Sequence, residues 1–302
     1  MNITDIDKAR LDRNCPMLSR TRGAGLGTAL QNIEKLASLY DPDRILRVNQ
    51  LASGSKKDGS SWDEGFTTLM AAINKARYII GTESIDYTDT HHVYIFVAPG
   101  NYSAEGRIAF SAKNIHIIGL GVPGGDTGVS IIPVSPSGFA FGGSGSGVEI
   151  ANIFIGVSTA IQALFWDYMD ACWFHDIVIG DLSGSPLMAY GVYTNGFNGS
   201  ILERVRIMNP RTAGIHVHGG ANKFCYGSVM RDNMLSSGVT CAKAIFIGSG
   251  LVGQMLIDHN FVFGDNFTKN IVVDHVAADV MVTDNYVHTA TEGGTTRGEH
   301  TS

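Results

Sequence analysis

The sequence predicts an all-β fold, a right-handed parallel β-helix, for residues from about 90 to 290. Two interleaved series of short apolar strands recur along this part of the chain with the same mean spacing. The 37 glycines fall between apolar segments without a collagen period, as in a protein with many turns. With 44% hydrophobic residues in a chain of 302, there is enough apolar material for one large core.

The first 50 residues are predicted to form a basic attachment arm. Residues 1–47 hold eight Lys or Arg against six Asp or Glu, net +2, whereas the remainder holds 14 against 22, net −8. An amphipathic helix is predicted over residues 28–40, because apolar residues recur there every three or four positions. We expect the arm to dock on a partner through its arginines, Arg10, Arg13, Arg20 and Arg22. A merely solvated terminus is the alternative.

Residues 51–110 are predicted to hold a capping helix and the first strands. Small polar residues at 52–61 indicate a linker, and the apolar spacing over 62–78 predicts a helix. The run VYIFVAPGNY at 93–102 predicts a strand that stops at Pro99-Gly100.

This segment resembles the beginning of the right-handed β-helix, pectate-lyase-like superfamily. The resemblance lies in DGSSW at 58–62, the helix that follows, and the Pro-Gly-Asn-Tyr turn at 99–102. With the repeated coils it extends over roughly residues 53 to 290, and it is greatest to β-helices of the phage spike and decoration type. The resemblance implies the fold and little about chemistry, because this architecture carries lyases, hydrolases, viral spikes and adhesins.

Residues 111–290 are predicted to form the coils. In the first series a polar residue precedes a short strand, at Asn114, Asn152, Asp176, Arg204, Asn233, Asn260 and Asn285, with steps of 24, 28, 29, 27 and 25 residues from Asn152 onward. The second series runs through Ile161, Val192, Ile215, Ile245 and Ile271. Each repeat therefore contributes at least two strands, as a solenoid requires. A β-sandwich would need a hairpin turn about every 8 to 12 residues, and few such turn signals are present.

The second series predicts which side chains point outward from the core. If Ile215 and its equivalents point inward, the residues that follow them point outward and form one column, Tyr193, His216, Phe246 and Val272. A second column contains His218 and Asp274, two coils or roughly 10 Å apart. Two interpretations remain open. The rings of Tyr193, His216 and Phe246 are buried between subunits, or they form a glycan platform beside an acid and a base.

No family active site can be placed on the sequence. Polygalacturonase-like and pectate-lyase-like motifs are matched only in fragments, and no nucleophile elbow, zinc motif or Walker lysine is present. The carboxylates near the turns, Asp176, Asp232, Asp258 and Asp284, are interpreted as turn formers, with a Ca²⁺ site as the alternative. The four cysteines form no CxxC pair. We therefore expect no catalytic residues, no cofactor and no metal.

These observations predict a virion structural protein, a β-helical spike or capsid-decoration subunit anchored by its arm. Its expected partners are two further copies in a homotrimer and other virion proteins, with a cell-surface glycan as a further possibility; no membrane or nucleic acid is expected. The charged N-terminus predicts that the chain is not conventionally secreted. Residues 291–302 are predicted to be a flexible polar tail. The alternative function is a polysaccharide lyase or glycoside hydrolase on an acidic glycan, using His216, His218 and Asp274.

Overall fold

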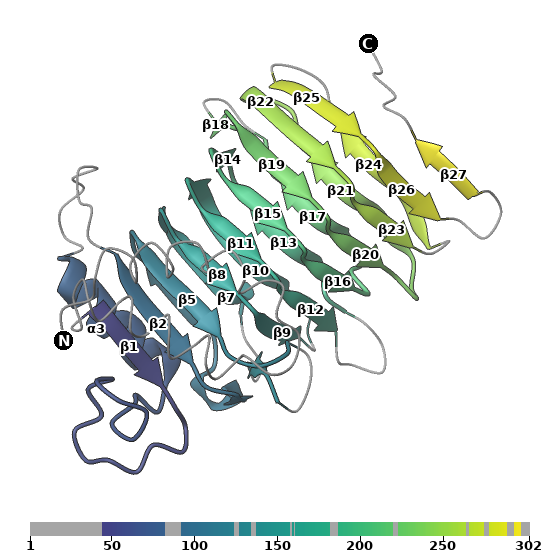
Figure 1. Cartoon of the computed structure of the whole chain (residues 1–302). Coiled ribbons are helices and arrows are strands. Elements are labelled where there is room, and N and C mark those ends of the chain that lie inside the picture. The colour runs from purple at the N-terminus through teal and green to yellow at the C-terminus, as the bar shows by residue number, and fades with distance from the viewer. Residues whose placement is uncertain are drawn as a thin grey trace, which may run out of the picture.

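The computed structural model describes residues 44–81, 92–123, 127–133, 137–157, 159, 161–181, 187–219, 223–263, 266–274, 278–288 and 293–296. The predicted helix over 28–40 and the four arginines of the arm lie outside these residues. Within them the chain forms the predicted right-handed parallel β-helix, a stack of coils that runs from helix α3 (Leu69–Ile80) at one end to β27 (Gly293–Thr296) at the other (Figure 1).

Most coils contribute a strand to each of three sheets, which we name A, B and C and which are parallel apart from the pairing of β27. Sheet A contains β1 (Ile45–Val48), β2 (Val93–Val97), β5 (Ile115–Gly119), β8 (Glu149–Ala151), β11 (Trp173–His175), β15 (Ile201–Glu203), β19 (Ser228–Arg231), β22 (Leu251–Asp258) and β25 (Ala278–Thr283), with the short β18 (Lys223–Phe224) also beside β22. Sheet B contains β3 (Gly100–Asn101), β6 (Val129–Ile131), β9 (Ile153–Val157), β12 (Val178–Asp181), β16 (Arg206–Met208), β20 (Met234–Ser236), β23 (Phe261–Phe263), β26 (Asn285–His288) and β27. Sheet C contains β4 (Ile108–Ser111), β7 (Phe139–Ser146), β10 (Gln162–Asp170), β13 (Tyr190–Thr194), β17 (Ala213–Val217), β21 (Cys241–Ile247) and β24 (Phe267–Val273), with β14 (Phe197–Asn198) beside β10.

The core is a continuous column of apolar side chains inside the three sheets. Val192, Ile215 and Ile245 occupy one register position on successive strands of sheet C, and each is at most 1% exposed. The equivalent residue of β10 is Leu164, so Ile161 was the wrong member of this series. Ile271 continues the register in β24 but is only half-buried, and the neighbouring Val273 is 38% exposed although it was expected to point inward. The core thus weakens in the last coil.

The turn from sheet A to sheet B uses one left-handed residue in each coil. These residues have φ between 50° and 58° and are Asn152, Asp176, Arg204, Asp232, His259 and Asp284. Asn114 has the same conformation but lies between β4 of sheet C and β5 of sheet A, so it was the wrong member of the first series. Asn and Asp tolerate this conformation, and Asp176, Asp232 and Asp284 are therefore turn formers, as predicted. In the last three coils the left-handed residue lies one position before the asparagine. The first series predicted from the sequence is therefore offset by one residue in these coils.

Those three asparagines form a ladder inside the corner between sheets A and B. Asn233, Asn260 and Asn285 are all 0% exposed. The Nδ2 of Asn233 donates to Oδ1 of Asn260 over 2.8 Å, and Nδ2 of Asn260 donates to Oδ1 of Asn285 over 2.9 Å. Each amide also donates to a backbone carbonyl of sheet A, at 2.9 to 3.1 Å. The asparagine amides thus satisfy backbone carbonyl groups at this corner.

Helix α3 covers the N-terminal end of the core. It packs on β1 and β2 through Leu69, Ala72, Ile73, Ala76 and Ile80, which are buried. The predicted start at residue 62 was wrong, because Phe66 bridges to Val48 and Thr68 caps the helix. The carboxylate of Glu105 also accepts from the first two helix amides, at 2.5 and 2.9 Å. The helix ends at Gly81, whose φ of 69° suits a C-cap.

Both ends of the β-helix extend beyond the predicted boundaries. Strand β1 pairs with β2 in sheet A, so the last residues of the predicted 1–50 arm belong to the β-helix. At the other end β27 pairs antiparallel with β26, so the predicted tail of 291–302 includes a short strand. No helix within the described residues is long and apolar enough to cross a membrane.

Candidate functional site

A strip of rings runs along the outer face of sheet C and contains the predicted column. Tyr193, His216, Phe246 and Val272 occupy one register position on β13, β17, β21 and β24, as expected. The ring centroids of Tyr193 and His216 are 4.9 Å apart, and those of His216 and Phe246 are 4.7 Å apart. Phe165 on β10 lies 6.0 Å from Tyr193 and 5.0 Å from Phe139 on β7. We call Phe139, Phe165, Tyr193, His216 and Phe246 the ring strip.

His216 is the unusual member of the ring strip because it is buried on an outer face. The side chain is 7% exposed, covered by Tyr190, Tyr193 and Phe246, and neither ring nitrogen has a hydrogen-bond partner among the described residues. Burial, together with the nearby His218 and Lys243, lowers the pKa of His216 to about 4. The imidazole is therefore neutral near pH 7 and carries a buried N–H and a buried lone pair that no described residue satisfies.

His218 and Asp274, the other two residues of the predicted acid–base set, are both exposed at the end of their strands. The rings of His216 and His218 lie 5.7 Å apart, and Asp274 follows β24, two coils further along. The backbone N–H of His218 donates to Thr194 and that of Asp274 to Ile247, which keeps the two residues on different coils. No hydrogen bond joins any two of these three side chains in the described structure.

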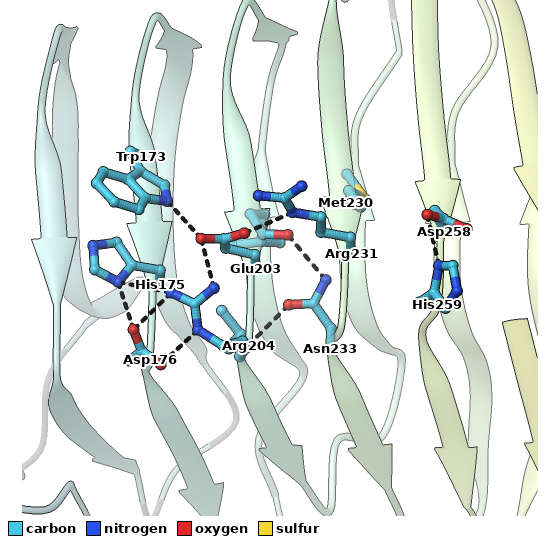
Figure 2. Close-up of polar contacts among 12 residues, drawn as sticks. Trp173, His175, Asp176, Glu203, Arg204, Met230, Arg231, Asn233, Asp258 and His259 are labelled. Carbon is cyan, nitrogen blue, oxygen red and sulfur yellow. Dashed lines mark hydrogen bonds and ion pairs between the residues drawn. The ribbon is translucent and has the colours of Figure 1, made fainter. Parts of the chain in front are cut away.

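A second cluster, absent from the sequence prediction, lies on the outer face of sheet A (Figure 2). It begins at β5, where Nδ1 of His116 lies 2.6 Å from Oε2 of Glu149 on β8. The other Glu149 oxygen lies 3.0 Å from Nε2 of His175 on β11, and Nδ1 of His175 lies 2.7 Å from Oδ2 of Asp176. Each group therefore links two neighbouring coils, and we call this series the ion ladder.

The ion ladder continues through two arginines to β19 (Figure 2). Arg204 holds Asp176 through Nε and Nη2 at 2.8 and 2.9 Å, and its Nη1 lies 2.7 Å from Oε1 of Glu203. Glu203 is 2% exposed, and its second oxygen accepts from Nε of Arg231 at 2.7 Å. The indole N–H of Trp173 also donates to Glu203, over 3.1 Å. Every carboxylate of the ladder thus has at least two partners.

These contacts fix the charge of the ladder. Burial would raise the pKa of Glu149, but hydrogen bonds from His116 and His175 outweigh it and lower the pKa to about 2. Burial likewise opposes the shift of Asp176, whose pKa is lowered by His175 and Arg204. The pKa of His175 is raised above 6.5, because Asp176 and Glu149 together outweigh its burial. Since a carboxylate faces each nitrogen of His175, both bonds are complete only when the ring is an imidazolium.

The ion ladder is poorly suited to general acid–base chemistry. Carboxylates with lowered pKa values do not donate protons near pH 7, and both Glu203 oxygens are occupied. Glu105 has a pKa raised by burial, but both of its oxygens accept from helix α3. Neither the ladder nor Glu105 supplies the pair of separated carboxyl groups that glycoside hydrolysis uses.

One group of side chains has the spacing of metal ligands. Asp258, His259 and Asp284 place one ligand atom each within 4.8 Å of one another at the corner between sheets A and B. The Nδ1 of His259 lies 2.7 Å from Asp258, and His259 and Asp284 are the left-handed turn residues of their coils. His259 and Asp284 are therefore explained as turn residues, whereas Asp258, predicted to be a turn former, is the last residue of strand β22.

The comparisons with known proteins add no residue role. No family model matches the sequence, and no curated protein matches it. Among solved structures, the chain is similar to a pectin methylesterase variant crystallised with a hexasaccharide, with 11% sequence identity and a TM-score of 0.48. That match covers 85% of this chain and 93% of the other.

A positional signal for the ion ladder is present in the sequence. His175, Glu203, Arg231 and Asp258 each immediately precede the left-handed turn residue of their coil. Aligning the coils on that turn would have placed these four side chains in one outward column. The predicted first series was aligned on Asn233 and Asn260, one residue after the left-handed residues, and it therefore did not predict this column.

Proposed function

We propose that this chain is a virion structural protein, a β-helical spike or capsid-decoration subunit that associates with copies of itself through sheet C. The observation that carries the proposal is the ring strip on the outer face of sheet C. Phe165, Tyr193 and Phe246 are only half-buried there, whereas His216 lies under Tyr193 and Phe246 with both ring nitrogens buried within the subunit. A neighbouring subunit on this face would cover the half-buried rings.

The chemistry of the outer faces supports a structural role. The carboxylates on sheet A are held in ion pairs, and the imidazole on sheet C is neutral and covered. The assignment to a virion is supported by the sequence resemblance to spike-type β-helices and by the basic part of the arm at residues 8–22, where Lys8, Arg10, Arg13, Arg20 and Arg22 face only Asp12. In this proposal the arm joins the trimer to other virion proteins, and the β-helix forms the projecting body.

The alternative function is a polysaccharide lyase or glycoside hydrolase acting on an acidic glycan. Tyr193 and Phe246 are half-buried and would offer ring faces to sugars. His216 would have to act as the base, and its covered ring with a pKa of about 4 is a weak base near pH 7. The separation of His218 from Asp274 also leaves no residue to orient either group.

Two measurements test the proposal. The full chain should be a trimer that leaves acidic polysaccharides such as polygalacturonate intact, as measured by reducing ends and by unsaturated products. A variant that begins at residue 44 keeps β1, so it should stay folded and trimeric but no longer associate with assembled particles. A monomer that cleaves the polysaccharide would overturn the structural role in favour of the enzyme.

A further inference from the structure

Trp173 and Arg231 are exposed on sheet A and are held by the same buried carboxylate. The indole N–H of Trp173 donates to Oε1 of Glu203 over 3.1 Å, and Nε of Arg231 donates to Oε2 over 2.7 Å. Glu203 is 2% exposed, whereas Trp173 is 40% exposed and the Arg231 side chain is 48% exposed. One inaccessible carboxylate, which lies between them in Figure 2, thus fixes two accessible side chains in place.

The exposed parts of these two side chains have no partner among the described residues. The indole of Trp173 stacks on His175, with ring centroids 3.9 Å apart and 26° between the ring planes, and no second ring of the described structure contacts it. The other face of the indole is therefore open to a ligand. In Arg231 only Nε has a partner within the described part of the chain, and the terminal nitrogens Nη1 and Nη2 have none.

Arg204 on the same sheet shows what a fully used arginine looks like. Its Nε and Nη2 bond to Asp176 and its Nη1 bonds to Glu203, so all three of its nitrogens are engaged. Arg231 keeps a planar pair of terminal N–H groups, a geometry that matches the two oxygens of a carboxylate. Trp173 adds a flat apolar surface on the other side of Glu203.

We infer that Trp173 and Arg231 form a subsite for a carboxylate-bearing sugar, such as one uronic acid unit of a glycan. The sugar ring stacks on the indole, and its carboxylate accepts two hydrogen bonds from Nη1 and Nη2 of Arg231. The two residues lie on β11 and β19, two strands or roughly 10 Å apart between backbones, and both side chains reach towards Glu203 on the strand between them. A single sugar unit can therefore contact both.

This subsite is separate from the ring strip on sheet C and does not depend on the proposed self-association. Asp258, which is opposite Arg231 on β22, does not occupy its terminal nitrogens, because Oδ2 of Asp258 lies 2.7 Å from Nδ1 of His259 instead. The donors of Arg231 thus remain available to the carboxylate of a ligand.

Nuclear magnetic resonance of the full chain tests the subsite through the indole N–H signals of its three tryptophans. Methyl β-D-glucuronide should shift the Trp173 signal at millimolar concentrations and leave that of Trp166, which is buried in the core, unchanged. Methyl β-D-glucoside has the same ring without a carboxylate, and acetate has the carboxylate without a ring. Each should bind at least tenfold more weakly than the glucuronide.

Matched variants then assign the two contacts. Arg231→Lys keeps a cation beside Glu203 but loses the paired donors, and it should weaken glucuronide binding about tenfold. Arg206→Lys makes the same change at an exposed arginine of sheet B and should leave the affinity unaltered. Trp173→Ala should abolish saturation transfer from the protein to the sugar. An unchanged Trp166 signal shows that each variant is folded.

A Trp173 signal that does not move with glucuronide would overturn the subsite. Equal binding of the glucoside would overturn the role of Arg231, and equal binding of acetate would reduce the subsite to a site for simple anions. An Arg231→Lys variant that binds glucuronide as the wild type does would contradict the inference as well. None of these results bears on the proposed trimer, and a monomeric chain would leave the subsite intact.

Discussion

The outer faces of sheets A and C are built from the same coils but satisfy their polar groups differently. On sheet A, Glu149, Asp176 and Glu203 each bond to groups on neighbouring coils. On sheet C, the strands in equivalent coils carry rings, and the nitrogens of His216 have no partner within the described subunit. The polar groups of sheet A are paired within the subunit, so this face is stable in contact with water. Sheet C buries a polar group that has no hydrogen-bond partner, which is rare in a protein surface that faces water.

Coil stacking explains how both faces arise. In a parallel β-helix, equivalent residues of successive coils stack at intervals of about 4.8 Å. Outward side chains of the same kind in successive coils therefore form a continuous column. Alternating acids and bases in such a column produce a ladder of ion pairs. Repeated rings produce an apolar strip, which water does not satisfy.

The largest effect on the stability of the subunit is expected from Glu203→Ala. The change removes a carboxylate that is 2% exposed and that accepts from Nη1 of Arg204, Nε of Arg231 and the indole N–H of Trp173; Arg204 keeps only its bonds to Asp176. We expect the free energy of unfolding to fall by about 3–4 kcal/mol, measured by urea denaturation. The control is Asp279→Ala, an exposed acid of sheet A, which should change it by less than about 0.5 kcal/mol. Equal effects of the two substitutions would show that the ladder contributes little.

The pH dependence of unfolding should also report on sheet A. Stabilisation through Glu149 is complete above its ordinary pKa of 4.5 and is lost as the pH falls towards about 2, a contribution of about 2–3 kcal/mol. His175 has a raised pKa, so its contribution is complete below 6.5 and declines as the pH rises through the raised value. The lowered pKa of His216 acts in the opposite sense, because its contribution is complete above 6.5 and is lost as the pH falls towards about 4. Stability should therefore be greatest near pH 6.5 and should decline on the acid side through both His216 and Glu149.

Glu149→Gln distinguishes this account from general acid denaturation. The variant keeps the shape of the side chain and loses its charge, so the decline in stability below pH 4.5 should become shallower. An acid limb as steep as in the wild type would mean that other carboxylates determine it.

A smaller and more specific effect is expected from His216→Phe. In the dissociated subunit the change removes two unsatisfied buried nitrogens and extends the ring strip, so stability should rise by up to about 1 kcal/mol. The control is Tyr193→Phe, which keeps its ring in the strip and should change stability less. A His216→Phe variant that is less stable than the wild type would contradict this assignment.

Periodicity made the coils and the ring strip predictable from the sequence. Core residues such as Ile215 and Ile245 recur at the coil length, and strand alternation then places Tyr193, His216 and Phe246 outside. The start of α3 was not predicted, because it depends on Thr68 and on the distant Glu105 rather than on apolar spacing. The column of the ion ladder was missed because the first series was offset by one residue at Asn233 and Asn260. Its bonds between coils, such as that of Arg204 with Asp176, join residues about 28 positions apart and depend on that alignment.

The most direct test of the central claim is the mass of the intact wild-type chain in solution. Sedimentation equilibrium should give a species of three times the 32.3 kDa subunit mass, and Phe246→Asp should reduce it to the subunit mass while the β-rich circular dichroism spectrum is retained. A wild-type chain that stays monomeric at concentrations of tens of micromolar, or a trimer unaffected by Phe246→Asp, would contradict the assignment of sheet C as a subunit interface.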